Sequence, residues 1–245
     1  MTRDQATEAD SPATPERASS DPPWLYPDYV ATRRRAPAQP LVLLPGAMSE
    51  TTGPVFGRGR VRDTDADLTA QHEGAPIGER IIVAGRVVDS DGRPVRGSFV
   101  EVWQANAAGR YRHEVDDHPA PLDPNFTGLG RALTDAEGRY RFVTVKPGPY
   151  PWRNHANAWR PAHIHFSLFG SEFPQRLFTQ MYFPGDPLFF QDPIFNSVRD
   201  PKARAAMVAR FDLGTTVPER ALGYRWDIVL RGKNPTPLEE EDDDE

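Results

Sequence analysis

Short runs of β-branched and aromatic residues, each bounded by turn residues, recur along the central part of the chain. Residues 80–89 read RIIVAGRVVD and end in the turn signal SDG at residues 90–92. Residues 139–145 read RYRFVTV and follow a second turn at residues 135–138. Runs of this length and composition predict β-strands. The 26 prolines and 19 glycines among 245 residues are too many for a helical bundle and typical of a turn-rich β-protein.

Four further runs predict strands, and one segment predicts a helix. The additional strands are expected at residues 98–104, 161–169, 176–183 and 224–230. The helix is expected over residues 200–211, where Asp200 can act as N-cap and Pro201 suits the first turn. One face of this helix would carry Ala203, Met207, Val208 and Phe211. The predicted fold is mainly β, an antiparallel β-sandwich with an extended N-terminal arm and one short helix.

The composition divides the chain into four segments. Residues 1–23 are rich in polar and acidic residues and are expected to be a disordered tail. Residues 24–78 form an expected extended arm, which begins with an aromatic cluster that includes Tyr29. The β-sandwich domain, expected to carry the chemistry, spans residues 79–235, and residues 236–245 form an expected acidic, disordered tail.

Charge and composition exclude several function classes. The net charge of −6 comes from seven consecutive acids, EEEDDDE, at residues 239–245; without them, 28 acidic residues face 29 basic ones. No basic stripe predicts nucleic-acid binding, and no apolar run approaches the roughly 20 residues of a membrane span. The polar N-terminus does not resemble a signal peptide, so we expect a cytoplasmic protein. Because cysteine is absent, any metal must be bound by nitrogen and oxygen ligands.

The segment WRPAHIHFSLF, residues 159–169, places two histidines on one face of a predicted strand. Side chains alternate between faces along a strand. One face is apolar and belongs in a core, and it carries Ala162, Ile164, Phe166 and Leu168. His163 and His165 share the other face, as two metal ligands would. Taken alone, the pair fits two half-exposed strand histidines without a metal better than it fits a metal site.

Other residues able to take part in chemistry lie in the preceding loops. The proline-rich segment KPGPYPWRNHANAWR, residues 146–160, carries Tyr150, Trp152 and Arg160, and Tyr111 lies in the turn GRYRH. Taken singly, each tyrosine would be a packing residue, and Arg160 an ordinary partner of a surface acid.

In their order and spacing, these segments resemble the intradiol ring-cleavage dioxygenase family, whose members use non-haem Fe(III). The matching stretches span nearly everything from residue 49 to 232, at residues 49–59, 100–113, 121–131, 146–154, 159–166, 179–188 and 224–232. The resemblance implies one Fe(III) per chain, bound by Tyr111, Tyr150, His163 and His165. It makes Tyr150 and His165 axial, with Tyr111, His163 and a hydroxide equatorial.

This implied ligand set is chemically consistent with the ferric ion. A free phenol has a pKa of about 10, but a trivalent cation at bonding distance favours the phenolate. Two phenolates and a hydroxide balance three positive charges and select a hard ion over softer metals. By the family pattern, Tyr150 is the tyrosinate that leaves when a catechol dianion binds.

The resemblance assigns roles to further residues. It implies that Arg160 stabilises negative charge that develops beside the substrate ring, as a fixed guanidinium can. Gln180 matches the family's active-site glutamine, which with Arg160 and Tyr150 completes the implied catalytic set. The substrate-binding residues implied beside Arg160 are Trp152, Ile194 and Tyr29.

The implied reaction cleaves 3,4-dihydroxybenzoate with O2 to 3-carboxy-cis,cis-muconate. In that branch of the family, an iron-bearing β subunit of this kind assembles with a homologous α subunit into a hetero-oligomer. We expect no nucleic-acid and no membrane partner. The alternatives are an intradiol dioxygenase for catechol or hydroxyquinol, or a non-catalytic β-sandwich module. The lack of a separate helical N-terminal region argues against the catechol enzymes.

Overall fold

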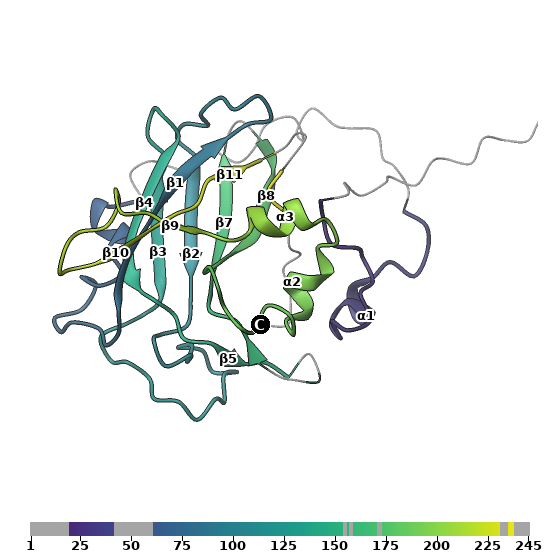
Figure 1. The fold of residues 1–245 in the computed structure, drawn as a ribbon, viewed down its shortest axis with the longest axis horizontal. Coiled ribbons are helices and arrows are strands. Elements are labelled where there is room, and N and C mark those ends of the chain that lie inside the picture. The colour runs from purple at the N-terminus through teal and green to yellow at the C-terminus, as the bar shows by residue number, and fades with distance from the viewer. Residues whose placement is uncertain are drawn as a thin grey trace, which may run out of the picture.

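Two packed β-sheets form the body of the computed structural model, which describes residues 20–41, 61–153, 156, 159–170, 173–230 and 235–237 (Figure 1). The first sheet contains β1 (Arg80–Val88), β4 (Arg139–Val145), β9 (Arg210–Phe211), β10 (Leu222–Arg225) and β11 (Ile228–Val229). The second contains β2 (Phe99–Trp103), β3 (Leu129–Leu133), β7 (His163–Gly170) and β8 (Phe173–Tyr182). A separate short pair joins β5 (Tyr150–Pro151) and β6 (Trp159–Arg160).

The strand pairings are mostly antiparallel. In the second sheet, β2 lies between β3 and β7, and β8 pairs with β7, all antiparallel. In the first sheet, β1 pairs antiparallel with β4 but parallel with β10 and β11. Parallel neighbours need a long crossover, and most of the chain separates β1 from these C-terminal strands. The predicted β-sandwich is therefore confirmed, with one mixed sheet.

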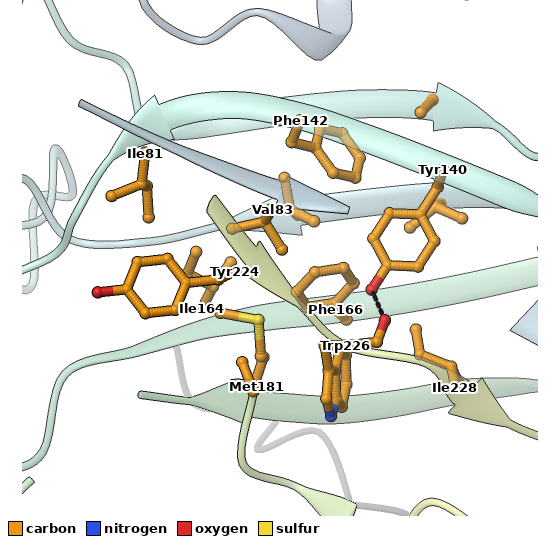
Figure 2. Close-up of a cluster of buried hydrophobic side chains, with 14 of the residues drawn as sticks. Ile81, Val83, Tyr140, Phe142, Ile164, Phe166, Met181, Tyr224, Trp226 and Ile228 are labelled. Carbon is orange, nitrogen blue, oxygen red and sulfur yellow. Dashed lines mark hydrogen bonds between the residues drawn. The ribbon is translucent and has the colours of Figure 1, made fainter. Parts of the chain in front are cut away.

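The core lies between the two sheets and is built largely from alternating residues of their strands (Figure 2). In β1 and β4, Ile81, Val83 and Phe142 point into it. From the segment WRPAHIHFSLF, the predicted apolar face is fully in the core, with Ala162, Ile164, Phe166 and Leu168 all buried. That placement confirms the predicted alternation of β7 and sends its histidines to the opposite face.

The run at residues 224–230 forms two strands instead of the one expected. The chain bends at Trp226, whose carbonyl accepts a hydrogen bond from the buried Tyr140 hydroxyl at 2.6 Å (Figure 2). The Trp226 N–H donates to the Ala84 carbonyl at 2.9 Å. A Cβ at Gly85 would lie 1.6 Å from the Trp226 carbonyl oxygen, so only glycine permits this approach. These long-range contacts interrupt the strand, and a local pattern cannot show them.

Three short helices occur in the described residues where the sequence predicts one. They are α1 (Thr32–Arg35), α2 (Pro193–Ser197) and α3 (Pro201–Ala206), and a 3₁₀ turn spans Asp63–Ala66. The three α-helices lie on one side of the sheets (Figure 1). None of the helices in the described ranges has the length and apolar character required to cross a bilayer.

The helix expected at residues 200–211 begins as predicted but ends early. The Asp200 carboxylate accepts from the Lys202 N–H at 2.8 Å, which confirms the N-cap. Beyond Ala206 the helix prediction is wrong, because the backbone pairs with β8 instead. The Tyr182 N–H donates to the Met207 carbonyl at 2.9 Å, and the Ala209 N–H donates to the Tyr182 carbonyl at 2.8 Å.

Several expected segments fall wholly or partly outside the described residues. These include most of the N-terminal tail, residues 42–60 of the arm, the matching stretch 49–59 and the seven acids at 239–245. Within the arm, Tyr29 is buried. At the other end, Thr236 is buried and its N–H donates to the Val229 carbonyl at 2.9 Å. The four segment boundaries remain predictions.

Replacing Tyr140 with Phe tests the contact that shapes the C-terminal strands. Tyr140→Phe leaves the buried Trp226 carbonyl without this donor, so we expect a loss of about 1–3 kcal/mol in the free energy of unfolding. Urea unfolding measures it. Tyr224→Phe is the control, because no hydrogen bond of the Tyr224 hydroxyl occurs in the described residues. Equal losses of unfolding free energy in the two variants would contradict the proposed contribution of the Tyr140 hydrogen bond to stability.

Candidate metal centre

His163 and His165 point to a common position from the face of β7 that is turned away from the core. Both side chains are buried, and their Nε2 atoms lie 3.2 Å apart. Two nitrogen ligands at right angles on one metal, each with a bond of about 2.1 Å, would be separated by about 3.0 Å. The observed separation therefore fits two neighbouring ligands of one ion. The alternative of two half-exposed histidines is wrong, because neither ring is exposed.

The surroundings of the two rings orient them for metal binding. His163 Nδ1 lies 2.7 Å from the Pro161 carbonyl oxygen, which can only accept, so Nδ1 carries the proton and Nε2 the lone pair. The His165 ring stacks on the ring of Trp103, its cross-strand neighbour on β2. The two ring centres are 5.0 Å apart, and the ring planes differ by 1°. Burial, followed by the charge of Arg160, lowers the pKa of both histidines well below the usual value. Both are therefore neutral imidazoles, the form that binds metals.

Tyr111, from a loop, and Tyr150, the first residue of β5, complete the cluster. The Tyr150 ring lies 5.4 Å from the His163 ring and 5.1 Å from that of Tyr111. The Tyr111 ring lies 6.4 Å from the ring of His165, and its backbone N–H donates to Asp116 at 2.7 Å. The four predicted ligands are thus gathered in one place.

A glycine allows the two tyrosine segments to touch. Gly109 has φ +77°, a conformation that favours glycine, and a Cβ there would lie 2.1 Å from the Pro149 carbonyl oxygen. Gly109 is two residues before Tyr111, and Pro149 directly precedes Tyr150. The close packing of these backbones therefore sets the distance between the two phenol rings.

The donor set fits a hard, highly charged cation. The described part of the chain contains no group of three or more His, Cys, Asp or Glu side chains able to hold a metal. A metal at this position would therefore depend on the two phenols as well as the imidazoles. Two phenolate oxygens and two imidazole nitrogens suit Fe(III) better than a soft or divalent ion.

Arg160 lies directly beside this cluster. It is only 1% exposed, so its alternative assignment as a surface salt bridge is wrong. Its Nη1 lies 3.2 Å from His163 Nε2 and 3.4 Å from the Tyr150 hydroxyl. Its Nη2 donates to Gln180 Oε1 at 2.7 Å. Gln180 reaches this position because it pairs with His165 across β7 and β8.

Two residues of this site were not foreseen from the sequence. Asp192 accepts from Arg160 Nε at 3.3 Å and Nη2 at 3.1 Å, and the Tyr182 hydroxyl accepts from Nη2 at 3.0 Å. Tyr182 lies two positions after Gln180 on the same strand face, a spacing that could have indicated it. Asp192 precedes a proline, which signals a helix cap but not an arginine partner.

Of the expected pocket walls, Trp152 lies next to Arg160, and the others lie beyond it. The Arg160 guanidinium carbon lies 5.4 Å from the centre of the Trp152 ring. The Tyr29 ring meets Trp152 edge-on at 5.4 Å, which brings the N-terminal arm to the site. Ile194 is buried at the start of α2 and lines the same small cavity as Tyr29. All the predicted site residues are therefore in one region, and their roles remain predictions.

Comparisons with known proteins agree with this arrangement. Residues 51–232 match a family model described as Dioxygenase, and residues 14–47 match the N-terminal model of the protocatechuate 3,4-dioxygenase beta subunit. The chain is 56% identical over 234 residues to the protocatechuate 3,4-dioxygenase beta chain of Burkholderia cepacia, covering 94% of this chain and 99% of that one. It is 31% identical over 207 residues to the protocatechuate 3,4-dioxygenase alpha chain of Pseudomonas putida. That match covers 80% of this chain and 97% of the alpha chain.

A solved structure shows the same fold. The 3-chlorocatechol 1,2-dioxygenase of Rhodococcus opacus 1CP superposes with a TM-score of 0.53 at 25% identity, covering 73% of this chain and 70% of that one. The family model spans most of the chain, and the beta-chain relative is similar along nearly its whole length. The chain therefore belongs to the intradiol dioxygenase family, as a homologue of the protocatechuate 3,4-dioxygenase beta chains.

Proposed function

We propose that this chain is the iron-bearing β subunit of a protocatechuate 3,4-dioxygenase. The enzyme cleaves 3,4-dihydroxybenzoate between its two hydroxyl-bearing carbons and incorporates both atoms of O2, giving 3-carboxy-cis,cis-muconate. The observation that carries the proposal is the convergence of two tyrosines and two histidines beside a buried arginine. One Fe(III) per chain would be held by Tyr111, Tyr150, His163 and His165.

The lengths of the relatives favour protocatechuate over other catechols. The chain covers 99% of the beta-chain relative, but 53% of a hydroxyquinol 1,2-dioxygenase and 59% of a catechol 1,2-dioxygenase. The N-terminal match to a beta-subunit model supports the same choice. The longer catechol and hydroxyquinol enzymes are therefore less similar in overall construction, although the sandwich is shared.

The tyrosine beside Arg160 supplies a proton acceptor. Held by these two tyrosines and two histidines, Fe(III) would supply a Lewis acid for the two oxygens of the diol. The Tyr150 oxygen would be suited to take a proton from a diol hydroxyl, because a phenolate, whose conjugate acid has a pKa of about 10, can act as a general base. Arg160 Nη1, at 3.4 Å from that oxygen, lies where it can contact both the tyrosine and the substrate.

Arg160 supplies a fixed positive charge to the reacting ring. It cannot deprotonate, and its buried contacts hold it in place without reorganisation. Negative charge that develops on the diol during attack by O2 would be stabilised by Nη1. The Trp152 ring and the aliphatic side chain of Ile194, together with Tyr29, would pack against the substrate ring and exclude water.

A homologous α chain is the proposed partner. Relatives named as protocatechuate 3,4-dioxygenase alpha chains match this chain along 97% and 93% of their length. Two chains with one ancestral fold can pair through related surfaces. We propose that the α chain completes the substrate pocket in a hetero-oligomer.

The proposal is tested with the iron-loaded protein, produced with and without a co-expressed α chain. Tyrosinate bound to Fe(III) gives a visible charge-transfer colour, and oxygen uptake should be fastest with protocatechuate. Faster uptake with catechol or hydroxyquinol would select that alternative substrate. A colourless iron-loaded protein that consumes no oxygen would instead indicate the non-catalytic module.

Removing a proposed ligand should weaken iron binding. We expect Tyr111→Phe and His165→Ala to lower iron affinity at least about tenfold, since loss of even an outer partner of a ligand costs that much. Iron content after dialysis against a chelator measures the effect. His72→Ala is the control, because His72 is not one of the proposed ligands. Its Nε2 lies 2.8 Å from the Thr127 hydroxyl. Normal iron retention in both ligand variants would refute the assignment.

Removing Arg160 should separate iron binding from turnover. Arg160→Ala is expected to keep iron and colour while kcat falls about 10²- to 10³-fold, the typical loss for a preorganised electrostatic group. Arg176→Ala is the matched control, because Arg176 lies on β8 and bonds Ser167 at 2.6 Å. Unchanged turnover of Arg160→Ala per bound iron would refute the role of this arginine.

A further inference from the structure

A buried carboxylate holds one side of the Arg160 guanidinium. Asp192 Oδ1 accepts from Nε at 3.3 Å, and Oδ2 accepts from Nη2 at 3.1 Å. Two parallel bonds of this kind fix the plane of a guanidinium as well as its position. Asp192 is 0% exposed and Arg160 1%, so water does not compete for the pair.

The remaining contacts of Arg160 divide between an anchored side and a reactive side. On the anchored side, Nη2 also donates to Gln180 Oε1 at 2.7 Å and to the Tyr182 hydroxyl at 3.0 Å. The Tyr182 hydroxyl in turn lies 2.8 Å from Gln180 Oε1. On the reactive side, Nη1 faces Tyr150 and His163. These contacts therefore leave Nη1 directed at Tyr150 and His163, beside which the proposed function places the reacting ring.

The negative charge of Asp192 compensates the buried positive charge of Arg160. A buried guanidinium is costly unless an anion compensates it. The neighbouring ligand cluster cannot supply that anion, because two phenolates and a hydroxide would only balance the charge of a bound ferric ion. The Asp192 carboxylate attracts the guanidinium from the opposite side and so resists its displacement.

Asp192 also fixes the apolar wall of the pocket. Its Oδ1 accepts from the Ile194 N–H at 3.2 Å, and its carbonyl accepts from the Asn196 N–H at 3.0 Å. The residue is therefore both the N-cap of α2 and the partner of Arg160. One side chain sets the relative position of the guanidinium and Ile194.

We propose that Asp192 is a positioning residue for the ring-cleavage reaction, which acts by orienting Arg160 and, through the α2 cap, Ile194. This inference rests on the proposed function. It assigns to Asp192 an effect on turnover that exceeds its effect on folding or on iron.

The chain contains a matched control for the cap. Asp200 precedes Pro201 as Asp192 precedes Pro193, and it caps α3 with a bond of 2.8 Å to the Lys202 N–H. This second cap is exposed and lies outside the arginine network. Asp192→Asn and Asp200→Asn therefore make the same chemical change at two similar helix starts, and only the first removes a charge next to Arg160.

The experiment compares these variants as iron-loaded protein assembled with the α chain. For Asp192→Asn we expect kcat on protocatechuate to fall about tenfold or more, since small misplacements of catalytic groups have effects of this size. Iron content and the visible band should stay, and the Kd of protocatechuate, titrated without oxygen, should change less than about threefold. Asp200→Asn should match the wild type in all four measurements. Equal kcat in Asp192→Asn and the wild type, or a loss that only follows lost iron, would overturn the proposal.

A double-mutant comparison tests whether Asp192 acts through Arg160. In the Arg160→Ala background, Asp192→Asn should cause little further loss of kcat, because the group it orients is gone. Losses that multiply would overturn the proposal. If Asp192→Asn does not fold, Tyr182→Phe provides the test, since it removes one contact of the same Nη2 and should lower kcat with iron retained. A wild-type enzyme inactive on every diol would instead reject the proposed function.

Discussion

The alternation of side chains along β7 is the constraint on which the rest of the site depends. Ile164 and Phe166 are buried between the two sheets, so His163 and His165 must face the other way. A shift of one residue in the pairing would exchange the two sets. The same register places Gln180 and Tyr182 opposite the histidines. Burial of apolar area in the core therefore fixes the positions of the polar groups behind it.

The segments around this face supply the remaining proposed ligands and the expected pocket walls. Close packing at Gly109 brings Tyr111 and Tyr150 together beside the histidines. The arm adds Tyr29 against Trp152, and α2 adds Ile194. Elements far apart in sequence thus converge on one position, where β7 carries two of the proposed ligands, and a loop and the short strand β5 carry the others.

The buried side chain of Arg160 contacts the candidate metal centre, the expected pocket wall at Trp152 and the residue that caps α2. Five polar side chains contact its guanidinium, and they come from β5, β7, β8 and the residue before α2. An isolated guanidinium at this depth would be unstable. Because Asp192 compensates this charge and also caps α2, it holds α2 at one position relative to β8. The stability of the buried charge and the position of α2 therefore depend on the same contacts.

The sequence by itself determined β1, β2, β4, β7 and β8, the two faces of β7 and, through the family resemblance, which side chains to expect at the site. The short strands β3 and β9 were not expected. Alternation and turn residues are local, so they can be read without coordinates. Only the tertiary structure decided that the helix after Asp200 ends at Ala206, that Trp226 interrupts the last strand, and that Asp192 and Tyr182 hold Arg160. Each of these depends on contacts between distant segments, whose free energy outweighs the local preference and leaves no periodic signal in the chain.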